Sequence, residues 1–107
     1  MSLPEVNLYP DFNTLRLSHL TLNVKDIKKS KDFYTHILGL QVTDESRKNV
    51  YFRCMEERGH HSLILIEDDE ASCNSISFKV FSENDLVKAE KFFVKNGKNV
   101  NRVKGDY

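Results

Sequence analysis

Hydrophobic and polar positions begin to alternate regularly early in the chain. Leu20, Leu22 and Val24 alternate with polar residues, and this period of two predicts a β-strand with one apolar face. Asp26 follows, and its carboxylate is suited to accept hydrogen bonds from the free amides of a first helical turn. The apolar residues of the helix fall on one predicted stripe, made of Ile27, Phe33, Tyr34, Ile37 and Leu38. Gly39 ends this helix, because glycine adopts a left-handed conformation without steric cost.

Three further strand patterns follow the helix. They cover Leu40 to Thr43, Val50 to Cys54 and Ser62 to Ile66. In the middle one, Val50, Phe52 and Cys54 share the apolar face, so Cys54 is expected to be a small buried hydrophobe. The predicted order of this unit is therefore β-α-β-β-β.

The pattern then starts again. The stretch "SISFKV" (75–80) corresponds to "HLTLNV" (19–24). A second helix is predicted from the cap Ser82, with Asp85 three residues later as in a capping box. Its apolar stripe comprises Leu86, Ala89, Phe92 and Phe93. Too few residues follow Val100 to form the remaining strands, so this second copy is expected to be incomplete.

The predicted fold class is α+β, a βαβββ module followed by an incomplete second copy. We expect an irregular lead-in at residues 1–14, the first module at 15–70 and the start of the second at 71–107. An incomplete module leaves an open sheet edge, and open edges favour self-association. A homo-oligomer is therefore expected.

Composition limits the classes of partner. The chain has 107 residues, with 16 Lys plus Arg and 16 Asp plus Glu, so its net charge is zero. This balance gives no electrostatic reason to expect nucleic acid or an anionic membrane as a partner. No apolar run approaches the length of a membrane span. Two cysteines and an N-terminus without signal-peptide character lead us to expect a cytoplasmic protein.

Several segments carry a family resemblance. The stretches are "SHLTLNVKD", "KSKDFYTHILGLQV" and "VYFRCMEERGHHSLIL". With the tandem βαβββ pattern, they resemble the vicinal oxygen chelate superfamily, which includes glyoxalases, antibiotic-resistance proteins and extradiol ring-cleaving dioxygenases. The resemblance covers residues 15–100 and is closer to the N-terminal domain of two-domain extradiol enzymes such as catechol 2,3-dioxygenase.

The resemblance implies a particular chemistry. Extradiol enzymes hold Fe(II) with two His and one Glu, leaving positions for a catechol-type substrate and O2. In the two-domain enzymes these ligands lie in the C-terminal domain, and the N-terminal domain is metal-free. The resemblance therefore implies that this chain is a non-catalytic N-terminal domain or fragment, with Fe(II) held in a C-terminal domain outside it. The alternative is a stand-alone relative, a small metalloenzyme or an antibiotic-sequestering protein, completed by pairing of chains.

His19 is the residue on which these hypotheses differ. It lies on the first strand, where the superfamily would place a metal ligand, and points away from the apolar face. Its counterpart in the second copy is Ser75, a poor ligand for Fe(II), and the strand Leu63–Leu65 offers no carboxylate before Glu67. His19 is therefore only a weak metal-ligand candidate and is expected to be structural. No residue is assigned as catalytic or cofactor-binding.

The remaining candidates favour ordinary roles. His60 and His61 are adjacent at a strand entry, where neighbouring side chains point to opposite faces, so one metal is not expected to bind both. His36 is expected to form an exposed pair with Asp32, four residues earlier. Cys73 is expected in a polar loop, and no histidine lies near it in sequence to activate it as a nucleophile.

Overall fold

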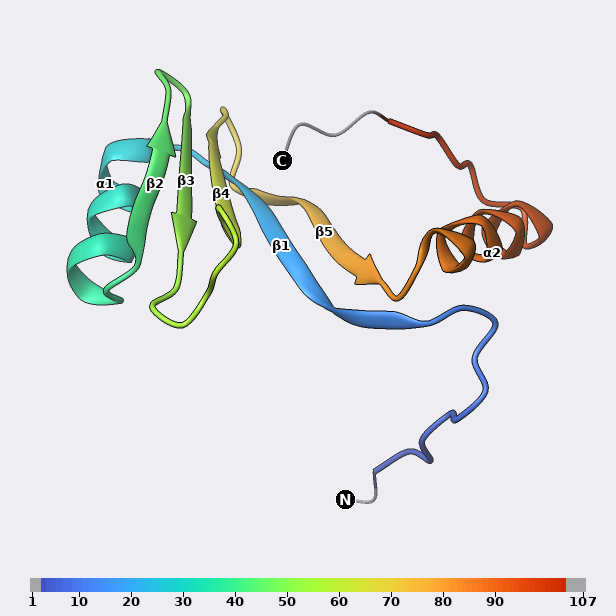
Figure 1. Cartoon of the computed structure of the whole chain (residues 1–107). Coiled ribbons are helices and arrows are strands. Elements are labelled where there is room, and N and C mark those ends of the chain that lie inside the picture. Colours follow the sequence, from blue (N-terminus) through green and yellow to red (C-terminus); the bar gives the residue numbers. More distant parts are fainter. Residues whose placement is uncertain (1–2, 104–107) are drawn as a thin grey trace. The chain divides into compact units, whose positions relative to one another are not determined.

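A computed structural model describes residues 3–103, and these form a mixed sheet with two helices (Figure 1). The elements in order are β1 (Thr14–Val24), α1 (Ile27–Asp32), the π-helical segment η1 (Phe33–Ile37), β2 (Gln41–Glu45), β3 (Asn49–Arg53), β4 (Leu63–Glu67), β5 (Ser72–Val80) and α2 (Glu83–Lys95). The predicted α+β class is confirmed. Contacts divide the molecule into two compact units, one of residues 17–78 and one of the described residues on either side of that range.

The sheet has the strand order β2-β3-β4-β1-β5. Strands β2, β3 and β4 form an antiparallel meander, whereas β1 pairs with β4 in parallel, with Leu20 opposite Leu63. The side chain of Asn23, near the end of β1, hydrogen-bonds Ser72 and Asn74 at the start of β5. These two strands therefore run in opposite directions, and β1 has a neighbour on both sides.

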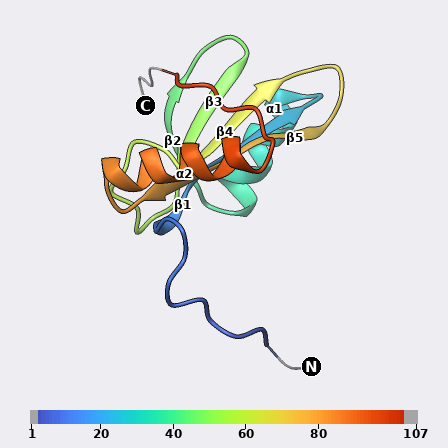
Figure 2. The same cartoon turned by 90° about the vertical axis from the view of Figure 1, so that its right-hand side faces the viewer.

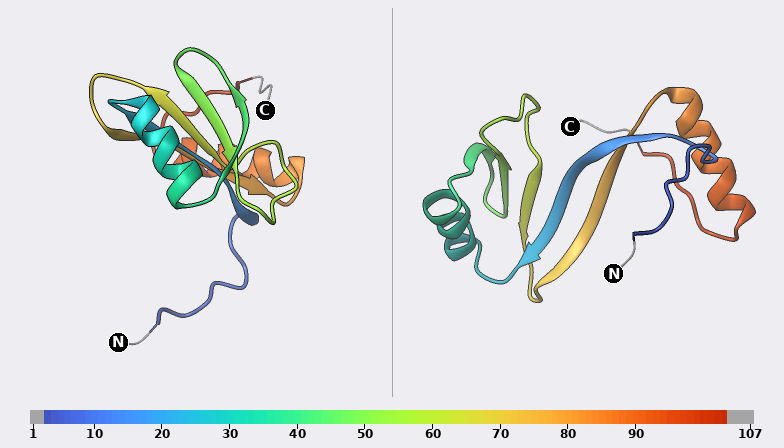
Figure 3. Two further views of the ribbon diagram at one scale, coloured as in Figure 1. Left: turned by 90° about the vertical axis from the view of Figure 1, so that its left-hand side faces the viewer. Right: turned by 90° about the horizontal axis from the view of Figure 1, so that it is seen from below.

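The core of residues 17–78 lies on one face of the sheet. Alternate residues of β3 and β4 are buried there, since side chains along a strand point to opposite faces in turn. The buried apolar residues of the cluster are Ile27, Val50, Phe52, Leu63 and Leu65. Leu20, Leu22 and Val24 of β1 pack against them, which confirms the predicted apolar face. Helix α1 covers this face, in front of the strands in the left view of Figure 3 and behind them in Figure 2.

The predicted apolar stripe of the first helix is only partly correct. Ile27 is buried and Tyr34 packs against the core, but Phe33, Ile37 and Leu38 are 43%, 69% and 54% exposed. The helix changes to π geometry at its end, where the Leu38 amide donates to the Phe33 carbonyl at 3.1 Å, five residues back. A π turn holds more residues than an α turn. The α-helical period therefore fails at this point, and the last apolar residues rotate away from the core.

Other differences concern strand ends. Strand β3 ends at Arg53, so Cys54 lies in a turn and is exposed, contrary to the prediction that it is buried. The Cys54 amide donates to the Glu57 carboxylate at 2.8 Å, and the Cys54 carbonyl accepts from the Glu57 amide. Cys73 lies within β5 and not in the loop before it, because that strand already begins at Ser72. It is exposed as well.

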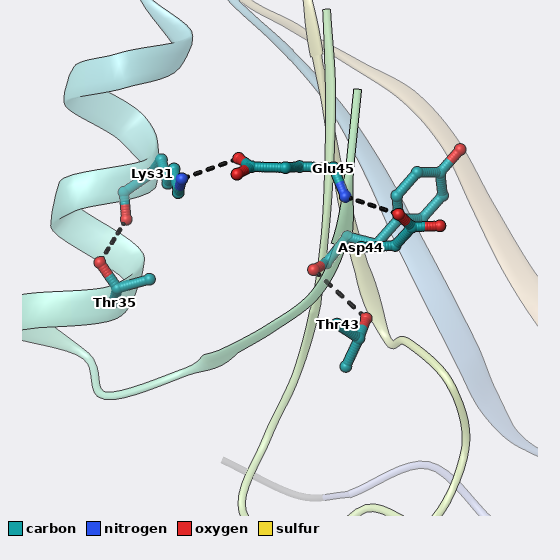
Figure 4. A network of polar contacts seen from close by, with 6 residues as sticks. Lys31, Thr35, Thr43, Asp44 and Glu45 are labelled. Atoms are coloured by element: carbon teal, nitrogen blue, oxygen red, sulfur yellow. Dashed lines mark hydrogen bonds and ion pairs between the residues drawn. The ribbon is translucent and has the colours of Figure 1, made fainter. Parts of the chain in front are cut away.

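The predicted helix ends are confirmed. The Asp26 carboxylate accepts from the Lys29 amide at 3.1 Å, and Gly39 has a φ of 76°, in the left-handed region. An ion pair of 2.7 Å between Lys31 and Glu45 joins α1 to β2 (Figure 4). Both side chains are well exposed, so this pair contributes little to stability.

Helix α2 is fixed to the residues before β1 in the second unit. Asn13 donates its backbone amide to the buried Asp85 at 3.0 Å, and the Ser82 hydroxyl donates to the same carboxylate at 2.7 Å. These hydrogen bonds, that of Ser82 first, hold the pKa of Asp85 below its usual value. The ring of Phe12 contacts Phe92 and Phe93, each at 5.7 Å between centroids. The last residues of the predicted lead-in therefore anchor α2.

Within residues 3–103, neither helix has the length and apolar character needed to cross a membrane.

Candidate functional site

The sheet face opposite α1 carries the candidate site of residues 17–78. The pairing register places Thr21 of β1, Ile64 of β4 and Tyr51 of β3 in one row across three neighbouring strands. Because the residues next to them in sequence form the core, these three point to the other face. His19 lies two residues before Thr21 and shares this face.

Tyr51 of this row belongs to a group of four rings, which we call the histidine cluster: His19, Tyr51, His60 and His61. The ring of His61 lies 5.2 Å from those of His19, Tyr51 and His60, measured between centroids, with interplanar angles between 64° and 87°. The Tyr51 and His60 rings are 6.1 Å apart. His61 is thus the central member, in edge contact with all three neighbours.

Hydrogen bonds within the cluster depend on protonation. The Nδ1 atoms of His60 and His61 are 2.9 Å apart, and the Ser18 hydroxyl lies 3.3 Å from Nδ1 of His19. A bond between two Nδ1 atoms needs one protonated donor and one deprotonated acceptor, so at least one of these rings is neutral. Partial burial lowers the pKa of His61, and repulsion from His19 and then His60 lowers it further.

The donor set of the cluster does not fit an Fe(II) site of two histidines and a carboxylate. Among the described residues, no group of three or more His, Cys, Asp or Glu side chains is placed to hold a metal ion. Glu67, the carboxylate at the end of β4, pairs with Val24, which lies five residues or about 16 Å along β1 from His19. Glu67 lies two residues after the buried Leu65 on the same strand, so its side chain points to the core face and not to the face that carries His19. Within residues 3–103, the cluster can stack rings and exchange protons, but its side chains are not placed together with a carboxylate as an Fe(II) centre of this type requires.

Sequence reasoning located one member of the cluster and missed the others. His19 was singled out, but His60 and His61 were set aside because adjacent strand residues point to opposite faces. Both precede β4, which begins at Leu63, so the strand rule does not apply to them. The position of Tyr51 could have been predicted from the sequence, because it alternates with Val50 and Phe52 and therefore lies on the same face as His19. His36 forms the predicted exposed pair with Asp32, at 3.5 Å.

Two proteins of known function are similar to this chain in sequence. The metapyrocatechase of Geobacillus stearothermophilus is 28% identical over 97 residues, which are 91% of this chain and 30% of that protein. The lactoylglutathione lyase of Pseudomonas putida is 40% identical over 58 residues, 48% of this chain and 34% of that protein.

Solved structures extend this relationship to the fold. A variant of homoprotocatechuate 2,3-dioxygenase from B. fuscum superposes with a TM-score of 0.85 at 33% identity, covering 94% of this chain and 28% of that one. The same enzyme from Brevibacterium fuscum, in an anaerobic complex with 3,4-dihydroxyphenylacetate, gives a TM-score of 0.78 at 34% identity, covering 85% and 28%. The chain thus spans less than a third of the length of each of these dioxygenases.

A family profile matches residues 16–107, nearly the whole chain. The sheet order, the helix on one face and the relatives agree with that match. The chain belongs to the Glyoxalase/Bleomycin resistance protein/Dioxygenase superfamily.

Proposed function

We propose that this chain forms the N-terminal, non-catalytic part of an Fe(II)-dependent extradiol dioxygenase that opens the ring of a catechol with O2. The observation that carries the proposal is the similarity of fold and sequence to extradiol dioxygenases over most of the chain, matched to about a quarter of theirs. Iron and catechol then bind in another part of the protein.

In this proposal the role of His19 is structural. Its ring fills the space beside His61, and its Nδ1 is within hydrogen-bonding distance of the Ser18 hydroxyl. The sheet face formed by β1, β3 and β4 supports the remainder of the enzyme and contributes no ligand to the iron. No residue between 3 and 103 is assigned a catalytic part.

Iron binding by the isolated chain tests the proposal. After anaerobic loading with Fe(II) and desalting, the 107-residue chain should retain well below one equivalent of iron and cleave no catechol. No three ligand-type side chains of the described residues converge on one point, so each Fe(II) would meet at most one or two imidazoles, which do not hold it against dilution as two histidines and a carboxylate do. Iron is measured by atomic absorption, and ring cleavage by the absorbance of the product. Stoichiometric, stable iron in this chain would overturn the proposal.

A variant of the natural full-length protein tests the role of His19 directly. His19→Ala should leave iron content and ring cleavage nearly unchanged, with at most a modest loss of thermal stability from the trimmed ring. His36→Ala is the matched control, since that side chain is 76% exposed and lies outside the histidine cluster, 3.5 Å from the Asp32 carboxylate. A folded His19→Ala protein that has lost its iron would make His19 a ligand.

The similarity to lactoylglutathione lyase favours a second candidate. In it, the chain is a stand-alone member of the superfamily, a small metalloenzyme or an antibiotic-sequestering protein, whose site is completed when two chains pair. The mass of one subunit, measured under denaturing conditions on the protein purified from its natural source, separates the two. A subunit of about three to four times the mass of this chain supports the dioxygenase, and one near 12.5 kDa supports the second candidate.

Self-association is part of both candidates. Several large apolar side chains of the second unit are exposed, namely Leu86, Phe93, Val94, Val100 and Val103. Apolar surface of this kind is usually covered by another part of a protein or by a partner. We expect the isolated chain to form dimers or larger assemblies, and a monomer in light scattering across a wide concentration range would contradict this.

A further inference from the structure

Three of the four histidines of the chain lie in the histidine cluster. Two of them, His60 and His61, belong to the loop that joins β3 to β4, the yellow-green segment of Figure 1. The other two rings, His19 and Tyr51, belong to strands of the sheet. The cluster is therefore a contact between a loop and the sheet surface, and three of its four rings are imidazoles, the side chain type whose charge can change near neutral pH.

Backbone hydrogen bonds between described residues fix both ends of this loop. At its end, the Ser62 amide donates to the Phe52 carbonyl at 2.7 Å, and the Ser62 carbonyl accepts from the Leu20 amide at 2.9 Å. At its start, Cys54 and Glu57 form a small turn. Between these points Met55 is 94% exposed and contributes no packing. The middle of the loop contacts the sheet through the rings of His60 and His61, which lie against His19 and Tyr51.

Protonation works against each of these contacts. When both His60 and His61 are charged, both Nδ1 atoms carry protons and the 2.9 Å contact between them becomes repulsive. A third positive charge on His19 repels His61 at the ring contact of 5.2 Å. Charged groups also occur on the neighbouring elements, namely Asp44 on β2, Arg53 on β3, and Glu56, Glu57 and Arg58 in the loop. Asp44 lies opposite Tyr51 in the sheet register.

We propose that the histidine cluster is a pH-sensitive clasp, which holds the β3–β4 loop on the sheet when its imidazoles are neutral and releases the loop when they are protonated. Release exposes the face that carries Thr21 and Tyr51. The lowered pKa of His61 agrees with this proposal, because a contact that favours the neutral ring lowers the pKa of a histidine. Because its pKa is lower in the folded state than the ordinary value of 6.5, the contribution to stability is complete above pH 6.5 and is lost as pH falls through the folded value.

Hydrogen exchange measured by mass spectrometry on the protein expressed from its natural gene tests the clasp. After correction for the intrinsic effect of pH, peptides from residues 54–62 should exchange several-fold faster at pH 5 than at pH 7.5, because the loop opens locally when its contacts with the sheet are lost. Peptides of β3 and β4 should change much less. His61→Phe keeps an aromatic ring but cannot be protonated, so the pH effect on the loop should disappear. His36→Phe, outside the cluster, should retain it.

Equal corrected exchange of the loop at both pH values would overturn the clasp, as would a pH effect that persists in His61→Phe. A second measurement covers the case in which His61→Phe does not fold. Nuclear magnetic resonance titration of the unaltered protein should give His61 a pKa below 6.5, together with chemical-shift changes of the loop amides at the same midpoint. A midpoint at or above 6.5, or loop amides that do not respond, would contradict the proposal.

Discussion

Ile27→Asp should lower the free energy of unfolding by about 3–5 kcal/mol, because it places an unpaired carboxylate in the core. Ile27 is 8% exposed and packs among Val50, Phe52 and the leucines of β4. No basic side chain belongs to that cluster. Chemical denaturation followed by circular dichroism measures the change as a shift of the midpoint at constant slope.

The same substitution on the outer side of the helix is the matched control. Ile37 is 69% exposed, so Ile37→Asp should change the free energy of unfolding by no more than about 0.5 kcal/mol. Leu38→Asp should behave in the same way, since Leu38 is 54% exposed. A regular helix with one apolar stripe would instead make all three variants severely unstable. Similar large losses at all three positions would therefore contradict the π turn.

Phe52→Ala should cost about 3–5 kcal/mol, the usual range for removing a buried aromatic ring and leaving a cavity. The Phe52 side chain is fully buried in the middle of the sheet face, and its ring lies 5.8 Å from that of Tyr34 on the helix. Its removal therefore weakens the contact between η1 and the sheet as well as the core itself. The thermal midpoint, measured at constant concentration, should fall accordingly.

Phe33→Ala provides the comparison for this variant. Phe33 is 43% exposed and contacts the outer side of Tyr34, with 5.2 Å between ring centroids. Loss of this ring should cost less than about 1 kcal/mol. If the two variants were equally destabilised, the core would not lie on the face to which the structure assigns it.

The sequence was sufficient to predict most elements of the fold. Period-two alternation located β3, β4 and the second half of β1 to within about two residues, because burial on one face requires it. The chemistry of Asp26 and Gly39 located the ends of the first helix. The facing of η1 was not predictable, since a π turn changes the helical period without a characteristic residue type. The apolar residues after it were therefore assigned to the core.

The site was predictable only in part. His19 could be placed because it lies on a regular strand, whose alternation determines the face. The positions of the His60 and His61 rings depend on the path of a turn, and no period governs turns. The contact between the loop and β1 joins residues about 40 positions apart. Such tertiary contacts have no local signature in the sequence.

The parallel pairing of β1 with β4 has a consequence for synthesis of the protein. The meander of β2, β3 and β4 is built from contacts between near neighbours, whereas β1 pairs with a strand that is made about forty residues later. Contacts distant in sequence form slowly, because a long loop must close first. On the ribosome, Leu20 and Leu22 must therefore wait for residues 63–67 to emerge. During that interval the first strand offers apolar side chains and free backbone groups, which a chaperone can cover until β4 has been made.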